Sequence, residues 1–328
     1  MIKLQIASRL RLTMTACLLY CMYDWKHDIA TAVKAIGSGN GWQLNLRGVI
    51  NGEGGNLEQA HTYLMENTEE AIRLEVKTDP AAVKEQAFWC GIKPGQRVLD
   101  LGCGSGKTTA ILHEMVQPGG SVVGVDYSSE RIAYAGKHYG GKEGIAFLSR
   151  DLTGPLHGIG QFDLIWVRFV LEYYRKESPS IVRNLKNLLK PGACLCLIDI
   201  DYNCLSHYEL PAGIGDLLPK LMAALDEKYN FDTHAGRKLY SYLYDAGYEN
   251  IQLHLMPHHL IYGKARDEDV FNWMKKVEIA TDKLEDLFTG YPGGHAAFTQ
   301  DFKRFFLDPR RFTYTPLILC KGMRPLGD

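Results

Sequence analysis

Short apolar runs alternate with longer, helix-like stretches from residue 97 onward. Turns that contain glycine or proline separate many of these elements. The apolar runs cover residues 97–101, 121–126, 145–148, 162–167 and 193–200. Strands that are buried on both faces of a parallel sheet have this appearance. The pattern predicts an α/β fold, a doubly wound, Rossmann-like domain with a mostly parallel, seven-stranded sheet.

Helical periodicity dominates after residue 201. The spacing of apolar residues predicts helices over 217–225 and 235–246, and again within 267–288 and 296–306. Because the last two helices separate strands expected at 250–262 and 312–321, they indicate an insertion rather than a second sheet domain. The expected organisation is an N-terminal helical extension or lid (1–79), a Rossmann-like core (80–262), a helical substrate cap (263–311) and the final core strand (312–328).

The N-terminal segment allows three interpretations. Lys3, Arg9 and Arg11 precede an apolar run over residues 12–23, which superficially resembles a secretory signal. No small-x-small cleavage site follows before Asp24. The segment is then an amphipathic helix packed on the body, an upstream translation before a natural start at Met22, or an export signal.

Composition and charge narrow the classes of partner. A hydrophobic content of 46% is enough for a sizeable core, which excludes wholesale disorder. The 37 basic and 38 acidic residues give a formal net charge of -1, and no run of like charges indicates a nucleic-acid partner. No apolar stretch reaches the roughly 18 residues of a membrane-spanning helix. The 8 cysteines are scattered without CxxC pairs, which predicts reduced thiols in a cytoplasmic protein.

A glycine-rich turn follows the first predicted strand. Turns of this kind bring a ligand close to the backbone and present unpaired amides at a helix N-terminus. The turn reads Asp100-x-Gly102-x-Gly104-x-Gly106. A phosphate-binding loop is excluded because the position five before Gly106 is a leucine, and a dinucleotide fingerprint fails because its third glycine would fall on a lysine.

The residues around this turn resemble the first motif of the class I S-adenosylmethionine-dependent methyltransferases. The motif is Val98-Leu99-Asp100-Leu101-Gly102-Cys103-Gly104-Ser105-Gly106. Four further segments are similar to the strands that follow in that family, namely 122–128, 147–152, 162–168 and 189–199. Together the five segments span roughly residues 80–201 in the family's order. The resemblance implies S-adenosylmethionine as the cofactor.

For the methionine end of that cofactor, the resemblance implies roles in the glycine turn. Asp100 would steady the turn and the amino end of the ligand. The backbone of Gly102, Cys103 and Gly104 would pass beside the methionine, where a side chain on either glycine would collide with it. Gly106 would complete this binding turn.

For the nucleoside end, the resemblance implies two acidic residues. Asp126 would accept hydrogen bonds from both ribose hydroxyls, since a carboxylate offers two acceptor oxygens. Tyr127 would pack beside the adenine. Asp151 would accept from the adenine amino group, and Leu152 would cover a face of the ring. Both carboxylates could instead cap their loops.

Four more residues are expected to line the same site. Val167 and Arg168 would lie at the end of the fourth strand near the sulfonium. Tyr63 and Arg73, in the lead-in segment, could meet the carboxylate of the cofactor or could serve packing alone. Lys107 could also reach that carboxylate or could be solvated. No residue is assigned to a metal.

Methyl transfer from a sulfonium is an in-line displacement, and an O- or N-acceptor also loses a proton. We favour His207 as the catalytic base because it follows the fifth strand, where open parallel sheets gather ligands; an ordinary surface histidine is the alternative. The other candidates are polar residues beyond the fourth and fifth strands or in the added elements: Glu172, Tyr173, Tyr174, Asp201, His258, His259 and His295.

The expected function is methylation of a small organic molecule, with oxygen ahead of nitrogen and carbon as acceptor atom. The fourth motif reads Val167-Arg168-Phe169-Val170 and lacks the Asn/Asp-Pro-Pro-Tyr/Phe signature of enzymes that methylate bases or glutamine. An NAD-dependent oxidoreductase and a non-catalytic methyltransferase-fold subunit are the alternatives. Monomer and homodimer both stay open.

Overall fold

The computed structural model describes residues 70–202 and 205–327. These residues belong to one compact unit of the chain, His61–Asp328. Tyr63 and the three interpretations of the N-terminal segment lie outside the described residues.

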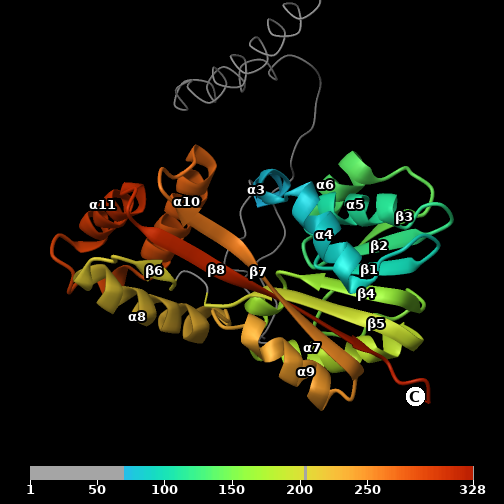
Figure 1. Ribbon diagram of the computed structural model, residues 1–328. Helices are drawn as coiled ribbons and strands as arrows, with labels where there is room; N and C mark the ends of the chain where they lie inside the picture. Colours follow the sequence, from blue (N-terminus) through green and yellow to red (C-terminus); the bar gives the residue numbers. More distant parts are fainter. Residues whose placement is uncertain (1–69, 203–204, 328) are drawn as a thin grey trace, which may run out of the picture. The chain divides into compact units, whose positions relative to one another are not determined.

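The centre of this unit is an eight-stranded mixed sheet (Figure 1). Five strands run parallel in the order β3-β2-β1-β4-β5, and β8 follows antiparallel to β5, with β7 antiparallel to β8. The chain reverses its direction of winding between β1 and β4, which is where doubly wound sheets bind ligands. The strands are β1 (Arg97–Leu101), β2 (Ser121–Asp126), β3 (Ile145–Ser149), β4 (Phe162–Arg168), β5 (Leu189–Ile200), β6 (His207–Tyr208), β7 (Glu249–Tyr262) and β8 (Phe312–Met323).

Helices cover both faces of the sheet because its strands are apolar on both sides. Leu99 of β1 belongs to a core that includes residues of α7 and α9, whereas its neighbour Val98 belongs to a second core with α4 and α5. The helices are α3 (Glu70–Lys77), α4 (Pro80–Cys90), α5 (Lys107–Met115), α6 (Ser129–Tyr139), α7 (Ser178–Leu185), α8 (Ala212–Tyr229), α9 (Leu239–Asp245), α10 (Asp267–Lys283) and α11 (Gly294–Leu307). The predicted fold class is confirmed.

A third hydrophobic core lies among α8, α10 and α11. It includes the aromatic side chains of Trp273, Phe298, Phe302 and Phe306, and Ile261 from β7. β7 and β8 pair along nearly their whole lengths, but only residues 317–323 of β8 pair with β5. The other half of the β7–β8 pair therefore extends beyond its pairing with β5. Ile261 in this half of β7 packs in the third core.

β6 is the strand that the sequence does not predict. It pairs His207 with Thr313 of β8, four positions beyond the pairing of Ile200 with Leu317. β6 thus continues the line of β5 along β8, after an interruption at residues 201–206. Four residues of strand correspond to about 13 Å.

Two further expectations from the sequence concern the cysteines and membrane-spanning helices. In the described ranges, Cys90, Cys103, Cys194, Cys196 and Cys320 are free and buried. Among the same residues, none of the helices combines the length and the hydropathy of a membrane span.

Candidate functional site

The glycine turn after β1 is fixed to the neighbouring strand. The N–H groups of Gly102 and Cys103 both donate to the carbonyl oxygen of Val125, at 2.7 and 3.0 Å. Gly102 and Gly104 have φ angles of 76° and 55°, and Gly106 has 86°. These angles lie in the left-handed region, where glycine is favoured. The turn therefore requires glycine at all three positions.

Packing supplies a second reason for these glycines. A Cβ on Gly102 would lie 2.3 Å from Cγ2 of Val170, and one on Gly104 would lie 2.9 Å from Cδ1 of Leu74. The sequence analysis attributed the small size of both residues to a close ligand. The chain's own side chains also approach the turn, and the contact with a ligand stays a prediction.

Asp100 is buried behind the turn. Its Oδ2 accepts a hydrogen bond from the Thr109 hydroxyl at 2.7 Å. Burial raises the pKa of Asp100 from 3.8 to about 7, against the opposing effects of Thr109 and Arg168. Cys103, in the same turn, is also buried, and burial raises the pKa of its thiol well above the usual range. The cysteine is therefore an unreactive thiol that packs under the turn.

Asp126, the last residue of β2, connects three parts of the site. Its Oδ2 accepts from the Gly104 N–H at 2.8 Å. Its Oδ1 accepts from the Ser128 N–H at 3.0 Å and from the Arg131 guanidinium at 2.9 and 3.0 Å. The sequence analysis missed Arg131, since an arginine on the first turn of a surface helix gives no signal of its own. Asp126 thus ties the glycine turn to α6 through a buried ion pair.

The residues expected to bind the adenine differ from one another in their burial. Asp151 is exposed, and its Oδ1 accepts from the Thr153 N–H and hydroxyl at 2.9 and 2.8 Å. Tyr127 is 44% exposed, whereas Leu152 is buried in the sheet core. The carboxylate of Asp151 therefore caps its own loop here, which was the alternative interpretation of this residue.

Helix α3 lies against the glycine turn. Glu75 accepts hydrogen bonds from the Ser105 hydroxyl at 3.3 Å and the Tyr139 hydroxyl at 2.6 Å. Lys107 Nζ donates to the Glu75 carbonyl oxygen at 2.6 Å and lies 3.7 Å from its carboxylate. Lys107 is thus partly buried and bound to α3, and its contact with the cofactor carboxylate stays a prediction. In the same helix, Arg73 donates twice to the carboxylate of Glu70, at 2.7 Å each.

The end of β4 brings Val167 and Arg168 to the same edge of the sheet. Val167 is buried in the sheet core. Arg168 Nε donates to Oε1 of Gln86 at 2.9 Å, and burial lowers its pKa from 12.5 to about 10. Phe169 follows with a φ of 58°, an uncommon angle for a bulky residue that often marks a functional site.

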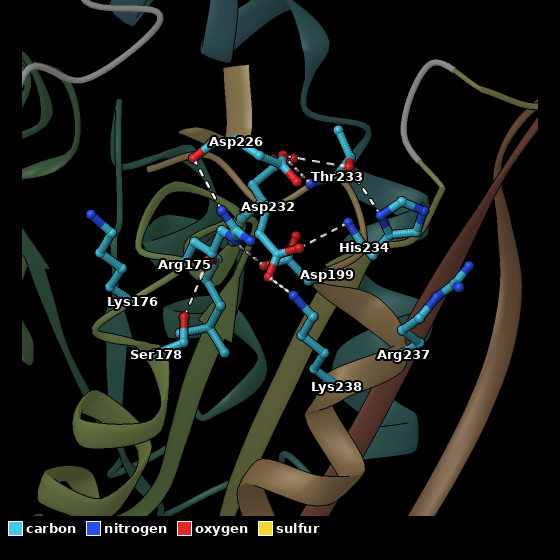
Figure 2. A network of polar contacts seen from close by, with 12 residues as sticks. Arg175, Lys176, Ser178, Asp199, Asp226, Asp232, Thr233, His234, Arg237 and Lys238 are labelled. Atoms are coloured by element: carbon cyan, nitrogen blue, oxygen red, sulfur yellow. Dashed lines mark hydrogen bonds and ion pairs between the residues drawn. The ribbon is translucent and has the colours of Figure 1, made fainter. Parts of the chain in front are cut away.

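A network of polar side chains lies around the end of β5, and Figure 2 shows Asp199, Asp232 and Lys238 within it. The Glu172 N–H donates to Oδ2 of Asp199 at 3.2 Å, and its carbonyl oxygen accepts from the Asp232 N–H at 2.6 Å. Asp232 in turn accepts from Lys238 and from the His234 N–H. Burial raises the pKa values of both Glu172 and Asp199. Glu172 is therefore a buried acidic residue in a fixed position just after β4.

His207 lies on β6 and packs into the third core. Its Nδ1 lies 2.8 Å from the Thr313 hydroxyl. Its ring is edge-on to those of Trp273, Phe302 and Phe305, with centroids 5.1 to 5.9 Å apart. Such packing is typical of a structural histidine. Its role as a base stays a prediction.

Comparisons with known proteins agree with this geometry. Residues 92–252 match the model of a methyltransferase domain family. An uncharacterized methyltransferase of Synechocystis sp. is 36% identical over 110 residues, 33% of this chain and 49% of the relative. Juvenile hormone acid O-methyltransferase of Bombyx mori is 38% identical over 129 residues, 36% of this chain and 45% of the relative. Arsenite methyltransferase of Aquipseudomonas alcaligenes is 33% identical over 132 residues, 36% of this chain and 38% of the relative.

The matched segment spans less than half of each of these relatives. Among solved structures, a protein of Bacillus halodurans C-125 assigned as a methyltransferase has a TM-score of 0.51 at 18% identity, covering 75% of this chain and 99% of that one. This likeness shows the fold. Residues 92–252 are therefore a methyltransferase domain, and this part of the chain belongs to the class I S-adenosylmethionine-dependent methyltransferases, as its motifs predict.

Proposed function

We propose that the chain is an S-adenosylmethionine-dependent methyltransferase that acts on a small organic molecule. The observation that carries this proposal is the link between the glycine turn and Asp126. The hydrogen bond from the Gly104 N–H to Asp126 joins the turns after β1 and β2, which together would bind the nucleoside. Both turns lie beside the point where the sheet reverses its winding. S-adenosylmethionine supplies the electrophilic methyl group.

Asp126 is proposed to hold the ribose through one oxygen. Its Oδ1 already receives three hydrogen bonds from Ser128 and Arg131. Its Oδ2 receives one, from Gly104, and a carboxylate oxygen offers about two acceptor sites. The carboxylate therefore has room for one ribose hydroxyl while the ion pair with Arg131 is kept. This is fewer than the two hydroxyls expected from the resemblance.

The remaining site residues keep the roles given by the resemblance. Asp151 would turn from its loop to the adenine amino group, and Leu152 would cover the ring. The backbone over Gly102–Gly104 would contact the methionine. Arg73 would approach the carboxylate of the cofactor from α3.

Glu172 is a better candidate for the base than His207. It lies four residues after the end of β4, it is buried, and its backbone N–H and carbonyl groups are both hydrogen-bonded. A raised pKa makes a carboxylate a stronger base, which suits removal of a proton from an O- or N-acceptor.

Calorimetric titration with S-adenosylmethionine tests the cofactor. We expect saturable binding by the wild-type protein, and a lack of binding heat would reject the proposal. Fluorescence titration with NADH serves as the control, and tight NADH binding would favour an oxidoreductase. Turnover of a panel of small O-, N- and C-acceptors then separates an enzyme from a binding subunit.

A further inference from the structure

Three segments of the chain converge on the ring of Phe169. Lys77 Nζ, at the end of α3, lies 5.2 Å from the centre of this ring. The guanidinium carbon of Arg168 lies 4.1 Å from it. The ring of His258, on β7, is edge-on to it at 4.9 Å. The uncommon φ angle of Phe169 therefore places its ring between cationic and imidazole groups at the end of β4.

The same group of side chains reaches the third core. His258 lies 4.2 Å from His259, measured between ring centroids, and His259 lies 5.6 Å from Trp273. Lys276 Nζ, on α10, lies 4.9 Å from the centre of the same Trp273 ring. We call Lys77, Arg168, His258 and Lys276 the cationic cluster. It is built by α3, β4, β7 and α10, between the cofactor edge and the cap.

Positive charge exceeds negative charge around Lys77. Burial, together with the charges of Lys276, Arg73 and Arg168, lowers the pKa of Lys77 from 10.5 to about 7, and Glu172 acts in the opposite direction. Arg73 is already paired with Glu70. The negative charges of Asp100 and Asp199 act on Arg168 and raise its pKa against the effect of burial. Lys77 is thus a partly buried cation, and Glu172 supplies the compensating charge.

Two polar atoms of the cluster lack hydrogen-bond partners within the described residues. No hydrogen bond or ion pair from 70–202 or 205–327 reaches Lys77 Nζ. Nε2 of His258 is buried and has no partner there either. Burial, together with His259 and the nearby cations, lowers the pKa of His258 well below 6.5, so its ring is neutral and donates one N–H. A buried polar atom without a partner, such as Nε2 of His258, is rare and calls for an explanation.

We propose that the cationic cluster binds an anionic oxygen group of the methyl acceptor, a carboxylate or a phosphate, with Lys77 Nζ and His258 Nε2 as its donors. This inference rests on the proposed function, because it names the substrate class of the same site. The proximity of Arg168 to Asp100, behind the glycine turn, connects the cluster to the cofactor edge. An acceptor held here by its anionic end would extend from the cap side toward the sulfonium.

The proposal predicts a particular pH dependence. An anion beside Lys77 raises the pKa of the ammonium, so binding takes up a proton once the pH exceeds the pKa of the unbound protein. With that pKa at about 7, the protonated fraction falls about twentyfold between pH 6.5 and pH 8.5. Glu172, Arg73, Arg168 and Lys276 face Lys77.

Sulfate is a suitable probe, because its own charge does not change between these pH values. Calorimetric titration of the full chain with sodium sulfate should give saturable binding at pH 6.5, and binding about twentyfold weaker at pH 8.5. Lys77→Met should weaken binding at pH 6.5 at least tenfold. Lys77→Arg should restore binding and abolish the pH dependence. Sodium acetate in parallel distinguishes a carboxylate site from a phosphate site.

A matched control is Lys275→Met, on the same helix as Lys276 but paired with Glu278 at the surface. Its sulfate affinity should equal that of the wild type. His258→Phe keeps the ring contact with Phe169 and should weaken sulfate binding while leaving its pH dependence. Equal affinities of the Lys77→Met and Lys275→Met variants, or no saturable binding by the wild type, would overturn the inference.

Titration of each variant with S-adenosylmethionine separates the two proposals. Absence of sulfate binding by the wild type, together with normal cofactor binding, counts against the cationic cluster alone. Absent cofactor binding in the wild type counts against the proposed function, whatever the sulfate result.

Discussion

A single carboxylate, that of Asp126, joins β2, the glycine turn and α6. Asp126→Ala should weaken S-adenosylmethionine binding more than tenfold, because it removes the proposed ribose contact and releases the Gly104 amide. It should also lower the free energy of unfolding by about 3–5 kcal/mol, because the buried Arg131 loses its ion pair with Asp126. Calorimetry and urea unfolding measure the two effects.

Asp151→Ala is the control for this variant. Its carboxylate is exposed and bonds only within its own loop, to Thr153, so the stability should change by about 0.5 kcal/mol or less. Cofactor affinity should still fall. Unchanged affinity in the Asp126→Ala variant would contradict the role of this residue.

Asp100 makes the stability of the fold depend on pH. Its pKa is about 7 in the folded chain and 3.8 as the ordinary value, so the folded state prefers the protonated form. The stabilisation from this proton is complete below pH 4 and is lost as the pH rises through 7. The shift corresponds to about 4 kcal/mol.

Asp100→Asn removes this titration while keeping an acceptor for Thr109. Relative to the wild type, the variant should be more stable at pH 8 than at pH 4.5, as measured by urea midpoints at both values. A stability difference that does not change with pH would show that Asp100 titrates normally.

At the scale of elements, Glu75 fixes α3 to the glycine turn. Glu75→Ala removes the contacts to the side chains of Ser105 and Tyr139 and the ion pair with Lys107. Hydrogen exchange of residues 70–77 should accelerate more than tenfold, while the amides of β1 keep their protection. Glu85→Ala, on the exposed face of α4, is the control and should leave both unchanged. Equal protection of α3 in both variants would show that Glu75 does not hold the helix.

The elements of the sheet could largely be predicted from the sequence. The runs 97–101 and 121–126 coincide with β1 and β2, because strands buried on both faces are apolar throughout and glycine or proline ends them. β6 was missed because two residues have no periodicity, and its pairing depends on β8, more than a hundred residues later.

The site was only partly predictable, for the same reason. The glycine turn and Asp126 are local and carry a motif. The Glu75 contacts and the cationic cluster depend on where α3, β7 and α10 pack, and long-range packing of this kind leaves no spacing to recognise.

At the scale of the whole described part, the third core, among α8, α10 and α11, is separate from the two cores of the sheet. Arg311 is 1% exposed and joins the segments of the cap by donating to the carbonyl oxygens of Phe306, Ile261 and Gly263. Arg311→Met should destabilise the cap by about 3 kcal/mol, because buried carbonyl groups lose their donor. Hydrogen exchange over α10 and α11 should accelerate, with cofactor affinity within threefold of the wild type.

Arg310→Met is the matched control, since Arg310 is an exposed neighbour paired with Asp308. It should leave exchange in the cap unchanged. If the Arg311 variant loses protection equally in β1 and β2, the two cores unfold together rather than separately.

The position of β8 has a consequence for biosynthesis. It is made after every other described strand, yet it lies between β5 and β7 and also receives β6. During translation, the five parallel strands can assemble early, since all of them precede residue 201. The edge of β5 then stays open until β8 emerges from the ribosome, so a nascent chain that pauses in the cap exposes a bare strand that chaperones must protect.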